Sequence, residues 1–202
     1  MILPARALAA VFGERVEGSL SPRIHRAAGD ATGFAMDYVA LSADDAATFA
    51  RGLEALRSLG AVGANVTHPY KFSAVAACDV LDAPARATEA VNTITWRAGR
   101  AEGANTDAPG FLRWLDDLQP EGLVHVLGTG GSARAVAWAL ERWGARFVVS
   151  GRREGAFDDV APLAPRDDAV LVVSTLPPSA SDVAAACLNP KKGARVVDLG
   201  CA

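Results

Sequence analysis

Apolar residues in the first part of the chain occur in two patterns, short continuous runs and repeats at a spacing of three or four residues. Continuous runs of small and branched residues predict strands, and the wider spacing predicts amphipathic helices. The last of these helices stops at Gly60, and Ser42 is its expected cap. Its apolar positions are Phe49, Leu53, Leu56 and Leu59. The predicted order is strand, helix, strand and helix over residues 6–13, 23–33, 35–42 and 43–60.

A change of pattern then suggests where the first domain ends. Residues 61–67 predict a strand, a helical stretch follows Pro69, and residues 90–107 predict two extended segments around a turn. A helix over residues 108–118 leads into the sequence QPEG, where proline and glycine interrupt the pattern. We therefore place a domain boundary after residue 118, so that the first domain comprises residues 1–118.

The second domain, residues 119–202, contains several apolar runs. Residues 122–144 predict a strand, a glycine-rich turn and a helix, and further strands follow at residues 146–150, 169–175 and 194–200. These runs are almost entirely apolar, as is typical of parallel strands covered on both faces. The fold class is therefore α/β, with an N-terminal α/β domain followed by a shortened Rossmann-type domain.

The composition excludes some partners. Half of the 202 residues are hydrophobic, and 20 basic residues against 23 acidic ones give a net charge of −3. Such a balance argues against a nucleic acid or an anionic membrane as the main partner. No window approaches the roughly 18 apolar residues that a membrane span requires, and Pro4 and Arg6 interrupt the N-terminus too early for a secretory signal.

The cysteines indicate a reducing compartment. Cys78, Cys187 and Cys201 are odd in number and widely spaced, with no CxxC pair and no nearby histidine to complete a zinc site. We expect reduced thiols, a cytoplasmic protein and no metal site.

The glycine-rich turn is the first candidate binding site. Gly128, Gly130 and Gly131 lie between a predicted strand and a predicted helix, where small residues let phosphate oxygens approach the amides of the helix N-terminus. Ala133 takes the last position of the GxGxxG pattern. Taken alone, the same glycines also fit a plain tight turn.

The end of the next strand predicts which dinucleotide is bound. An acidic residue there would bind the ribose of NAD, but the sequence is VVSGRR. Ser150, Arg152 and Arg153 can instead hold a 2′-phosphate through charge-assisted hydrogen bonds, which favours NADP. A solvated arginine pair is the alternative.

Polar segments also follow the predicted strands of the first domain. In an extended loop, Ser19 and Ser21 would point to the same side and share one carboxylate, although Ser-x-Ser-Pro also fits a turn and helix cap. Lys71 is one of three lysines in a chain that favours arginine, and its titratable ammonium suits general acid–base chemistry. A carboxylate such as Asp107 would orient it, whereas a solvated surface charge is the simpler interpretation.

Five segments in this order and spacing resemble the shikimate dehydrogenase family across essentially the whole chain: GSLSPRIH, GANVTHPYK, AVNT, GANTDAPGF and LGTGGSARAV. The resemblance implies reversible, NADP-dependent reduction of 3-dehydroshikimate to shikimate in aromatic amino-acid biosynthesis. It implies a catalytic pair of Lys71 and Asp107, with Ser19 and Ser21 on the substrate carboxylate. Further substrate contacts are implied for Asn65, Thr67, Asn92 and Asp107, and NADP contacts for Gly128, Thr129, Gly130, Gly131, Ser132, Gly151, Arg152 and Arg153.

Three departures from the family pattern affect these expectations. His68 replaces an apolar residue and either tunes Lys71 or packs against the loop, and SGRR replaces the usual Asn-Arg-Thr. Cys201 takes the place of a tyrosine, and the chain ends at Ala202 before the family's last helices, which supply a glutamine to the substrate. We therefore expect weakened binding of shikimate and retained binding of NADP.

Two alternatives stay open at the level of sequence. One is a non-catalytic or weakened protein that binds metabolites of the shikimate pathway in the same pocket. The other is a related dehydrogenase acting on quinate or an aminated analogue, because substrate choice depends on the shape of the pocket.

Overall fold

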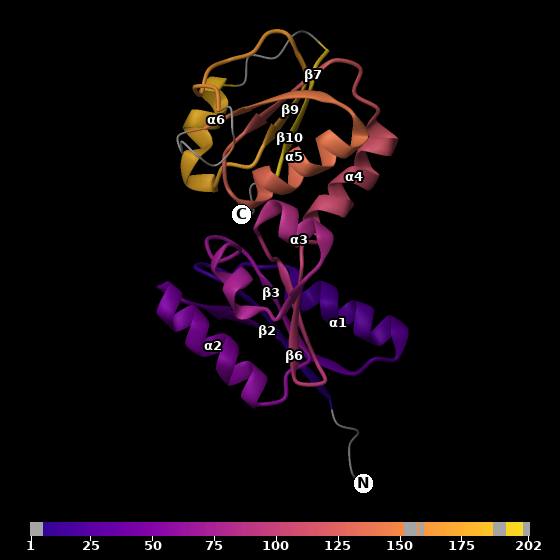
Figure 1. The fold of residues 1–202 in the computed structure, drawn as a ribbon, viewed down its shortest axis with the longest axis vertical. Coiled ribbons are helices and arrows are strands. Elements are labelled where there is room, and N and C mark those ends of the chain that lie inside the picture. Colours follow the sequence, from indigo (N-terminus) through magenta and orange to yellow (C-terminus); the bar gives the residue numbers. More distant parts are fainter. Residues whose placement is uncertain (1–5, 152–156, 158–159, 188–192, 200–202) are drawn as a thin grey trace. The chain divides into compact units, whose positions relative to one another are not determined.

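The computed structural model describes residues 6–151, 157, 160–187 and 193–199. The chain divides into two compact units, Met1–Asn105 and Thr106–Ala202 (Figure 1). This division comes earlier than the boundary predicted after residue 118. The reason is that α4 (Asp107–Leu118) places Phe111 and Leu115 in the hydrophobic core of the second unit.

A mixed sheet forms the centre of the first unit. Its strand order is β2-β1-β3-β5-β6-β4, where β1 is parallel to β2 and β3, and β5 is antiparallel to β3 and β6. The strands are β1 (Ala7–Gly13), β2 (Met36–Ser42), β3 (Gly63–Val66), β4 (Val80–Leu81), β5 (Thr93–Arg97) and β6 (Arg100–Ala104). The parallel half and the antiparallel hairpin bring the end of β3 and the start of β5 to the same edge.

Helices cover both faces of this sheet (Figure 1). They are α1 (Ser21–Thr32), α2 (Ala46–Ser58), the 3-10 helix η1 (Ser73–Ala77) and α3 (Ala83–Thr88). Side chains alternate along β1, so Phe12 packs edge-on against Phe49 of α2, with ring centroids 5.7 Å apart, while Val11 joins a smaller cluster on the opposite face. The ring of Phe49 also stacks on Tyr70, which ties the loop after β3 to this core.

The predicted cap of α2 is wrong by three residues. Asp45, not Ser42, is the N-cap, and its Oδ1 accepts a 2.6 Å hydrogen bond from the backbone N–H of Thr48. The hydroxyl of Ser42 instead donates to Oε1 of Glu17, because Ser42 is still the last residue of β2.

The second unit has the parallel sheet that its apolar runs predict. The strand order is β10-β9-β7-β8, with every neighbouring pair parallel. The strands are β7 (Leu123–Leu127), β8 (Arg146–Ser150), β9 (Ala169–Ser174) and β10 (Arg195–Asp198), and the helices are α4, α5 (Gly131–Trp143), η2 (Pro178–Ala180) and α6 (Ser181–Cys187). Val124 and Val126 share a hydrophobic cluster with side chains of α4 and α5, whereas Leu127 belongs to a second cluster that includes Val183 of α6. Figure 1 shows these helices around the sheet.

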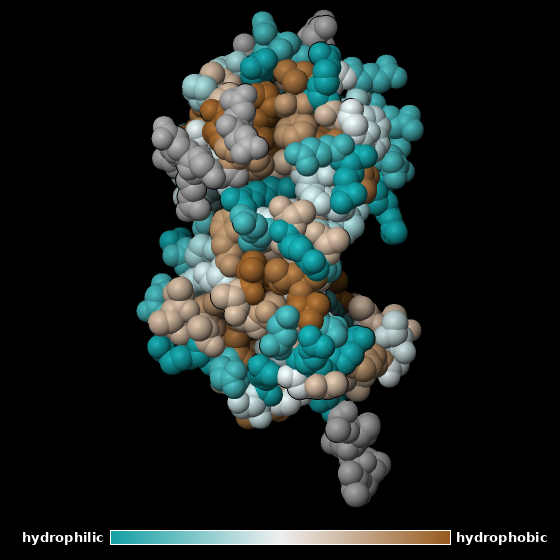
Figure 2. All heavy atoms as spheres, in the orientation of Figure 1, coloured by the Kyte–Doolittle hydropathy of each residue, from teal (hydrophilic) through white to brown (hydrophobic). Residues whose placement is uncertain are grey.

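The surface of the first unit carries exposed apolar side chains as well as polar ones. On the face drawn in Figure 2, hydrophobic residues gather over the middle of this unit and hydrophilic residues surround them. Leu20 and Ile24, at and near the start of α1, are both more than half exposed. Within the part of the chain that the structure describes, no helix is long and apolar enough to span a bilayer.

Candidate functional site

Backbone hydrogen bonds join three predicted polar segments at one edge of the first unit. The N–H of Val66 donates to the carbonyl of Asn92 at 2.8 Å, and the N–H of Val91 donates to the carbonyl of Lys71 at 2.8 Å. The N–H of Asn92 in turn donates to the carbonyl of Ala104 at 3.0 Å. The segments NVTHPYK, AVNT and GANT therefore meet in space, although up to 40 residues separate them in the sequence.

The side-chain amide of Asn65 is held in one orientation. Its Oδ1 accepts a 2.6 Å hydrogen bond from the hydroxyl of Tyr38, and its Nδ2 donates to Oγ1 of Thr93 at 3.1 Å. The Thr93 hydroxyl donates onward to Oδ1 of Asn92 at 3.0 Å. Because Nδ2 donates within the protein, the predicted contact of Asn65 with a substrate hydroxyl would use the remaining lone pair of Oδ1.

Tyr38, which sequence reasoning did not identify, supports this network from β2. Its side chain is buried, burial raises the pKa of its hydroxyl, and the His25 ring stacks on it with centroids 4.1 Å apart. The hydroxyl therefore acts as a neutral hydrogen-bond donor. A tyrosine in the predicted strand over residues 35–42 is the sequence signal that points to it, because a buried hydroxyl needs a partner.

The loop that carries Thr67 and Lys71 is anchored on the end of β1. The N–H of Thr67 donates to the carbonyl of Phe12 at 2.8 Å, and the carbonyl of His68 accepts from Glu14 at 3.1 Å. A methyl group on Gly13 would lie 2.5 Å from Cγ2 of Thr67, so only glycine permits this close approach. His68 itself is exposed, and Lys71 is partly buried.

The two serines do not lie in an extended loop as predicted. Leu20, between them, has φ −77° and ψ −11°, and Ser21 is already the first residue of α1. The Ser21 N–H donates to Oγ of Ser19 at 3.2 Å, which agrees with the turn of the alternative interpretation, but the N-cap of α1 is Leu20 and no side chain makes a capping hydrogen bond. Binding of a shared carboxylate by both hydroxyls stays a prediction.

The two residues of the predicted Lys71–Asp107 pair belong to different compact units. Lys71 belongs to the first unit, and Asp107, which is partly buried, is the first residue of α4 in the second. The pairing therefore stays a prediction.

In the second unit, the glycine-rich turn has the backbone that a phosphate cradle requires. Gly128 has φ +113°, and a methyl group there would lie 2.3 Å from Oγ1 of Thr175. Gly130 is the N-cap of α5, and a methyl group there would have no heavy atom within 4 Å. The turn is thus closed on the side of Thr175 and open at the helix N-terminus, where the partial positive charge favours an anion.

The end of β8 lies against the same turn. The N–H of Gly128 donates to the carbonyl of Ser150 at 2.8 Å, and a methyl group on Gly151 would lie 2.3 Å from Cγ2 of Thr129. Gly128, Thr129 and Gly151 therefore pack together at the carboxyl edge of the parallel sheet, which is where nucleotides bind in this kind of fold.

Ser150 does not fit its predicted role as a direct phosphate ligand. Its side chain is 0% exposed, and its Oγ lies 2.8 Å from Nε2 of His125 in the middle of β7. The alternation of β8 points this side chain into the unit rather than outward. Arg152 and Arg153 lie outside the described residues.

Asn105 is a second residue that sequence reasoning missed. It is fully buried, and its Nδ2 donates 3.0 Å hydrogen bonds to Oγ1 of Thr88 and to the carbonyl of Ala90. These bonds fix the start of the AVNT segment against the end of β6. An asparagine inside the GANTD motif is the only sequence signal for this role.

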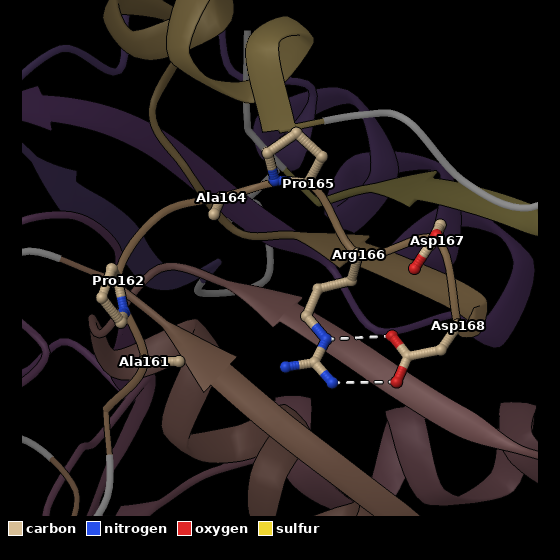
Figure 3. Close-up of a pocket in the computed structure, with 7 residues that line it drawn as sticks. All are labelled: Ala161, Pro162, Ala164, Pro165, Arg166, Asp167 and Asp168. Carbon is tan, nitrogen blue, oxygen red and sulfur yellow. Dashed lines mark hydrogen bonds and ion pairs between the residues drawn. The ribbon is translucent and has the colours of Figure 1, made fainter.

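A surface hollow of about 400 Å³ lies along the segment between β8 and β9. Figure 3 shows Arg166 and Asp168 at this hollow, joined by hydrogen bonds of 3.0 and 2.9 Å. The Arg166 guanidinium holds the pKa of the Asp168 carboxyl below its usual range. None of the residues that line the hollow belongs to the predicted site.

Metal ligands do not cluster in the described part of the chain. No group of three or more histidine, cysteine or acidic side chains could hold a metal ion there. Cys78 is a partly buried thiol, and burial raises its pKa to about 11, so it is protonated at neutral pH.

The first unit has a polar edge built from three segments, and the second has a parallel sheet with a glycine-rich turn. Together they define a two-domain α/β protein whose second unit is of the Rossmann type. The profile of the shikimate dehydrogenase substrate binding domain matches residues 11–94. Shikimate 5-dehydrogenase of Thermus thermophilus, solved with NADP(H) and shikimate, is 33% identical, with a TM-score of 0.75 over 84% of this chain and 68% of that one. The chain belongs to the shikimate dehydrogenase family.

Other relatives agree with this assignment. Shikimate dehydrogenase (NADP(+)) of Anaeromyxobacter sp. strain Fw109-5 is 39% identical over 80% of this chain and 58% of its own length. The structure of shikimate dehydrogenase from Aquifex aeolicus is 26% identical, with a TM-score of 0.82 over 98% of this chain and 88% of that one. The chain spans about half the length of the curated relatives that it matches.

Proposed function

We propose that the protein catalyses the NADP-dependent, reversible reduction of 3-dehydroshikimate to shikimate. The observation that carries this proposal is the meeting of three polar segments at one sheet edge, through the Val66–Asn92, Val91–Lys71 and Asn92–Ala104 backbone hydrogen bonds. This edge gathers one lysine, two amides and a threonine hydroxyl, which suit a small polyhydroxylated carboxylic acid.

The proposed chemistry assigns a role to each group. Oxidation of shikimate removes a hydride from one carbon and a proton from its hydroxyl, and bound NADP⁺ would accept the hydride. Lys71 would take the proton as a neutral amine and return it in the reverse direction, with Asp107 orienting the lysine. Ser19 and Ser21 would bind the carboxylate. The ring hydroxyls would be held by Asn65, Thr67, Asn92 and Asp107.

The described residues of the second unit fit the pyrophosphate part of NADP. The open N-terminus of α5 at Gly130 leaves room for phosphate oxygens beside backbone N–H groups. We assign the 2′-phosphate to Arg152 and Arg153. One charge-assisted hydrogen bond of about 1.5 to 3 kcal/mol corresponds to roughly a tenfold to 150-fold preference for NADPH over NADH.

Two measurements test the proposal. The first is the rate of NADP⁺ reduction with shikimate and with quinate, where we expect shikimate to be the better substrate. The second is titration of the protein with NADPH and NADH by intrinsic fluorescence. Equal affinities for the two cofactors would remove the arginines from their role, and a preference for quinate would change the assigned substrate.

The alternative of a non-catalytic metabolite-binding protein makes a different prediction. Such a protein would bind shikimate and NADP⁺ in calorimetric titrations but would show no reduction of NADP⁺ at saturating concentrations of both. We also propose a cytoplasmic location, which subcellular fractionation tests.

A further inference from the structure

His125 occupies an unusual place for a polar residue, in the middle of an otherwise apolar strand. It is 0% exposed, and it points away from the face on which Val124 and Val126 pack against α4 and α5. Its Nε2 lies 2.8 Å from Oγ of Ser150, the last residue of β8. This hydrogen bond crosses from β7 to β8 on the face opposite to α5.

The neutral imidazole is the form that suits this position. Burial and, to a smaller extent, Arg166 lower the pKa of His125, and Asp168 opposes this shift. In the described residues, Nδ1 has no hydrogen-bond partner, so a second ring proton would be unsatisfied. The neighbouring positions on this face of β8 and β9 are not ionisable: Val148, Ser150, Val172 and Ser174. Arg146, at the other end of β8, and Asp182, on α6, are exposed.

Ser150 connects His125 to the glycine-rich turn. The Ser150 side chain is held by His125, while its carbonyl accepts the hydrogen bond from the N–H of Gly128. The next residue, Gly151, packs against Thr129 so closely that no side chain fits between them. A shift of Ser150 would therefore move both Gly128 and Gly151.

We propose that His125 is a positioning residue for the cofactor site, which acts through Ser150 to hold the end of β8 against the glycine-rich turn. This inference rests on the proposed binding of NADP. His125 does not touch the cofactor. It sets the position of the end of β8 relative to the glycine-rich turn, beside which the phosphates would lie.

Three variants separate this role from a general effect on folding. His125→Leu fills the space but removes the hydrogen bond, and Ser150→Ala removes the same bond with a smaller change of volume. His125→Gln places an amide near the position of Nε2 and does not titrate. Ser174→Ala is the matched control, because Ser174 is a buried serine at the end of the adjacent strand whose hydroxyl has no partner among the described residues.

The readout is the dissociation constant of NADP⁺, measured by calorimetry at several pH values. At pH 7.5, we expect His125→Leu and Ser150→Ala to weaken NADP⁺ binding about threefold to tenfold, the usual effect of losing one hydrogen bond. His125→Gln and Ser174→Ala should bind as the wild type does, and shikimate binding should be unchanged in all four variants.

The pH dependence of NADP⁺ binding tests whether the neutral form of the His125 imidazole is required. A histidine whose pKa is lowered stays neutral as the pH falls through its ordinary value of about 6.5, and it loses its support of binding only as the pH falls through the lowered pKa. The wild type should therefore weaken relative to His125→Gln only below about pH 6.5, and the titrations extend to the lowest pH at which both proteins stay folded. The 2′-phosphate titrates equally in both proteins, so the ratio of the two constants isolates His125.

The possible outcomes are distinct. If the wild type binds NADP⁺ but His125→Leu and Ser150→Ala bind it equally well, the inference about His125 is overturned and the proposed function stands. A constant ratio between wild type and His125→Gln across the pH range overturns it as well. If the wild type binds no NADP⁺, the proposed cofactor fails and the inference fails with it.

Discussion

The hydroxyl of Tyr38 donates a 2.6 Å hydrogen bond to Oδ1 of Asn65, and this bond determines which way the Asn65 amide points. With Oδ1 facing Tyr38, Nδ2 faces Thr93 and the carbonyl of Asn92. Tyr38 on β2 therefore orients Asn65 on β3, a residue proposed to bind the substrate, although β1 lies between the two strands.

Tyr38→Phe should weaken shikimate binding without removing it. The substitution leaves the aromatic ring in place but removes one hydrogen bond worth about 0.5 to 1.5 kcal/mol, which corresponds to roughly a twofold to twelvefold increase in Kd. Calorimetric titration with shikimate measures the change. Tyr70→Phe is the control, since its hydroxyl donates to the backbone carbonyl of Ala43 and its loss should affect only stability. An equal loss of shikimate affinity in both variants would contradict the role of Tyr38.

Asn105→Ala should destabilise the first unit. The substitution removes the hydrogen bonds to the buried hydroxyl of Thr88 and the buried carbonyl of Ala90. We therefore expect the free energy of unfolding to fall by about 1 to 3 kcal/mol in urea denaturation. Combined with Thr88→Val, it should cost less than the sum of the two single changes, because both remove the same bond. Additive losses would show that this hydrogen bond contributes little.

The contact between Gly151 and Thr129 gives a prediction about the second unit. Gly151→Ala places a methyl group 2.3 Å from Cγ2 of Thr129, and the overpacking should lower the free energy of unfolding by about 1 to 3 kcal/mol and weaken NADPH binding. Thr129→Ser removes Cγ2, so the double variant should recover most of both losses. Failure of Thr129→Ser to rescue would mean that Gly151 is needed for its backbone or for direct approach of the cofactor.

Much of the second unit could be predicted because its two central strands, β7 and β9, are buried on both faces. Continuous apolar runs are then unavoidable, and β7, β8 and β9 follow them closely. The domain boundary was harder to predict, because QPEG interrupts the local pattern while α4 packs against α5 through Phe111 and Leu115. Contacts distant in sequence, rather than proline and glycine, decide where the units divide.

The sequence motifs of the site could be predicted, but the directions and hydrogen-bond partners of its side chains could not. The hydrogen bond from the N–H of Val66 to the carbonyl of Asn92 brings two of those motifs together, as their positions at the ends of predicted strands suggested. The direction of Ser150 could not be predicted, because one residue of register decides whether a side chain points inward or outward. His125 and Tyr38 were missed for a related reason, since their roles depend on partners in neighbouring strands.

Lys71 gives the most direct test of the proposed chemistry. Lys71→Ala should lower kcat for shikimate oxidation by roughly 10²-fold to 10⁴-fold, the usual effect of removing a general acid–base group. NADPH affinity should be unchanged, because the glycine-rich turn belongs to the other compact unit. Lys71→Arg is the matched variant: it keeps the positive charge, but with a pKa above about 12 it does not exchange a proton at neutral pH. Its KM for shikimate should therefore stay closer to that of the wild type while its kcat stays low. Steady-state kinetics of NADP⁺ reduction measure both constants, and a Lys71→Arg variant with wild-type kcat would show that the charge, and not proton transfer, is what the reaction requires.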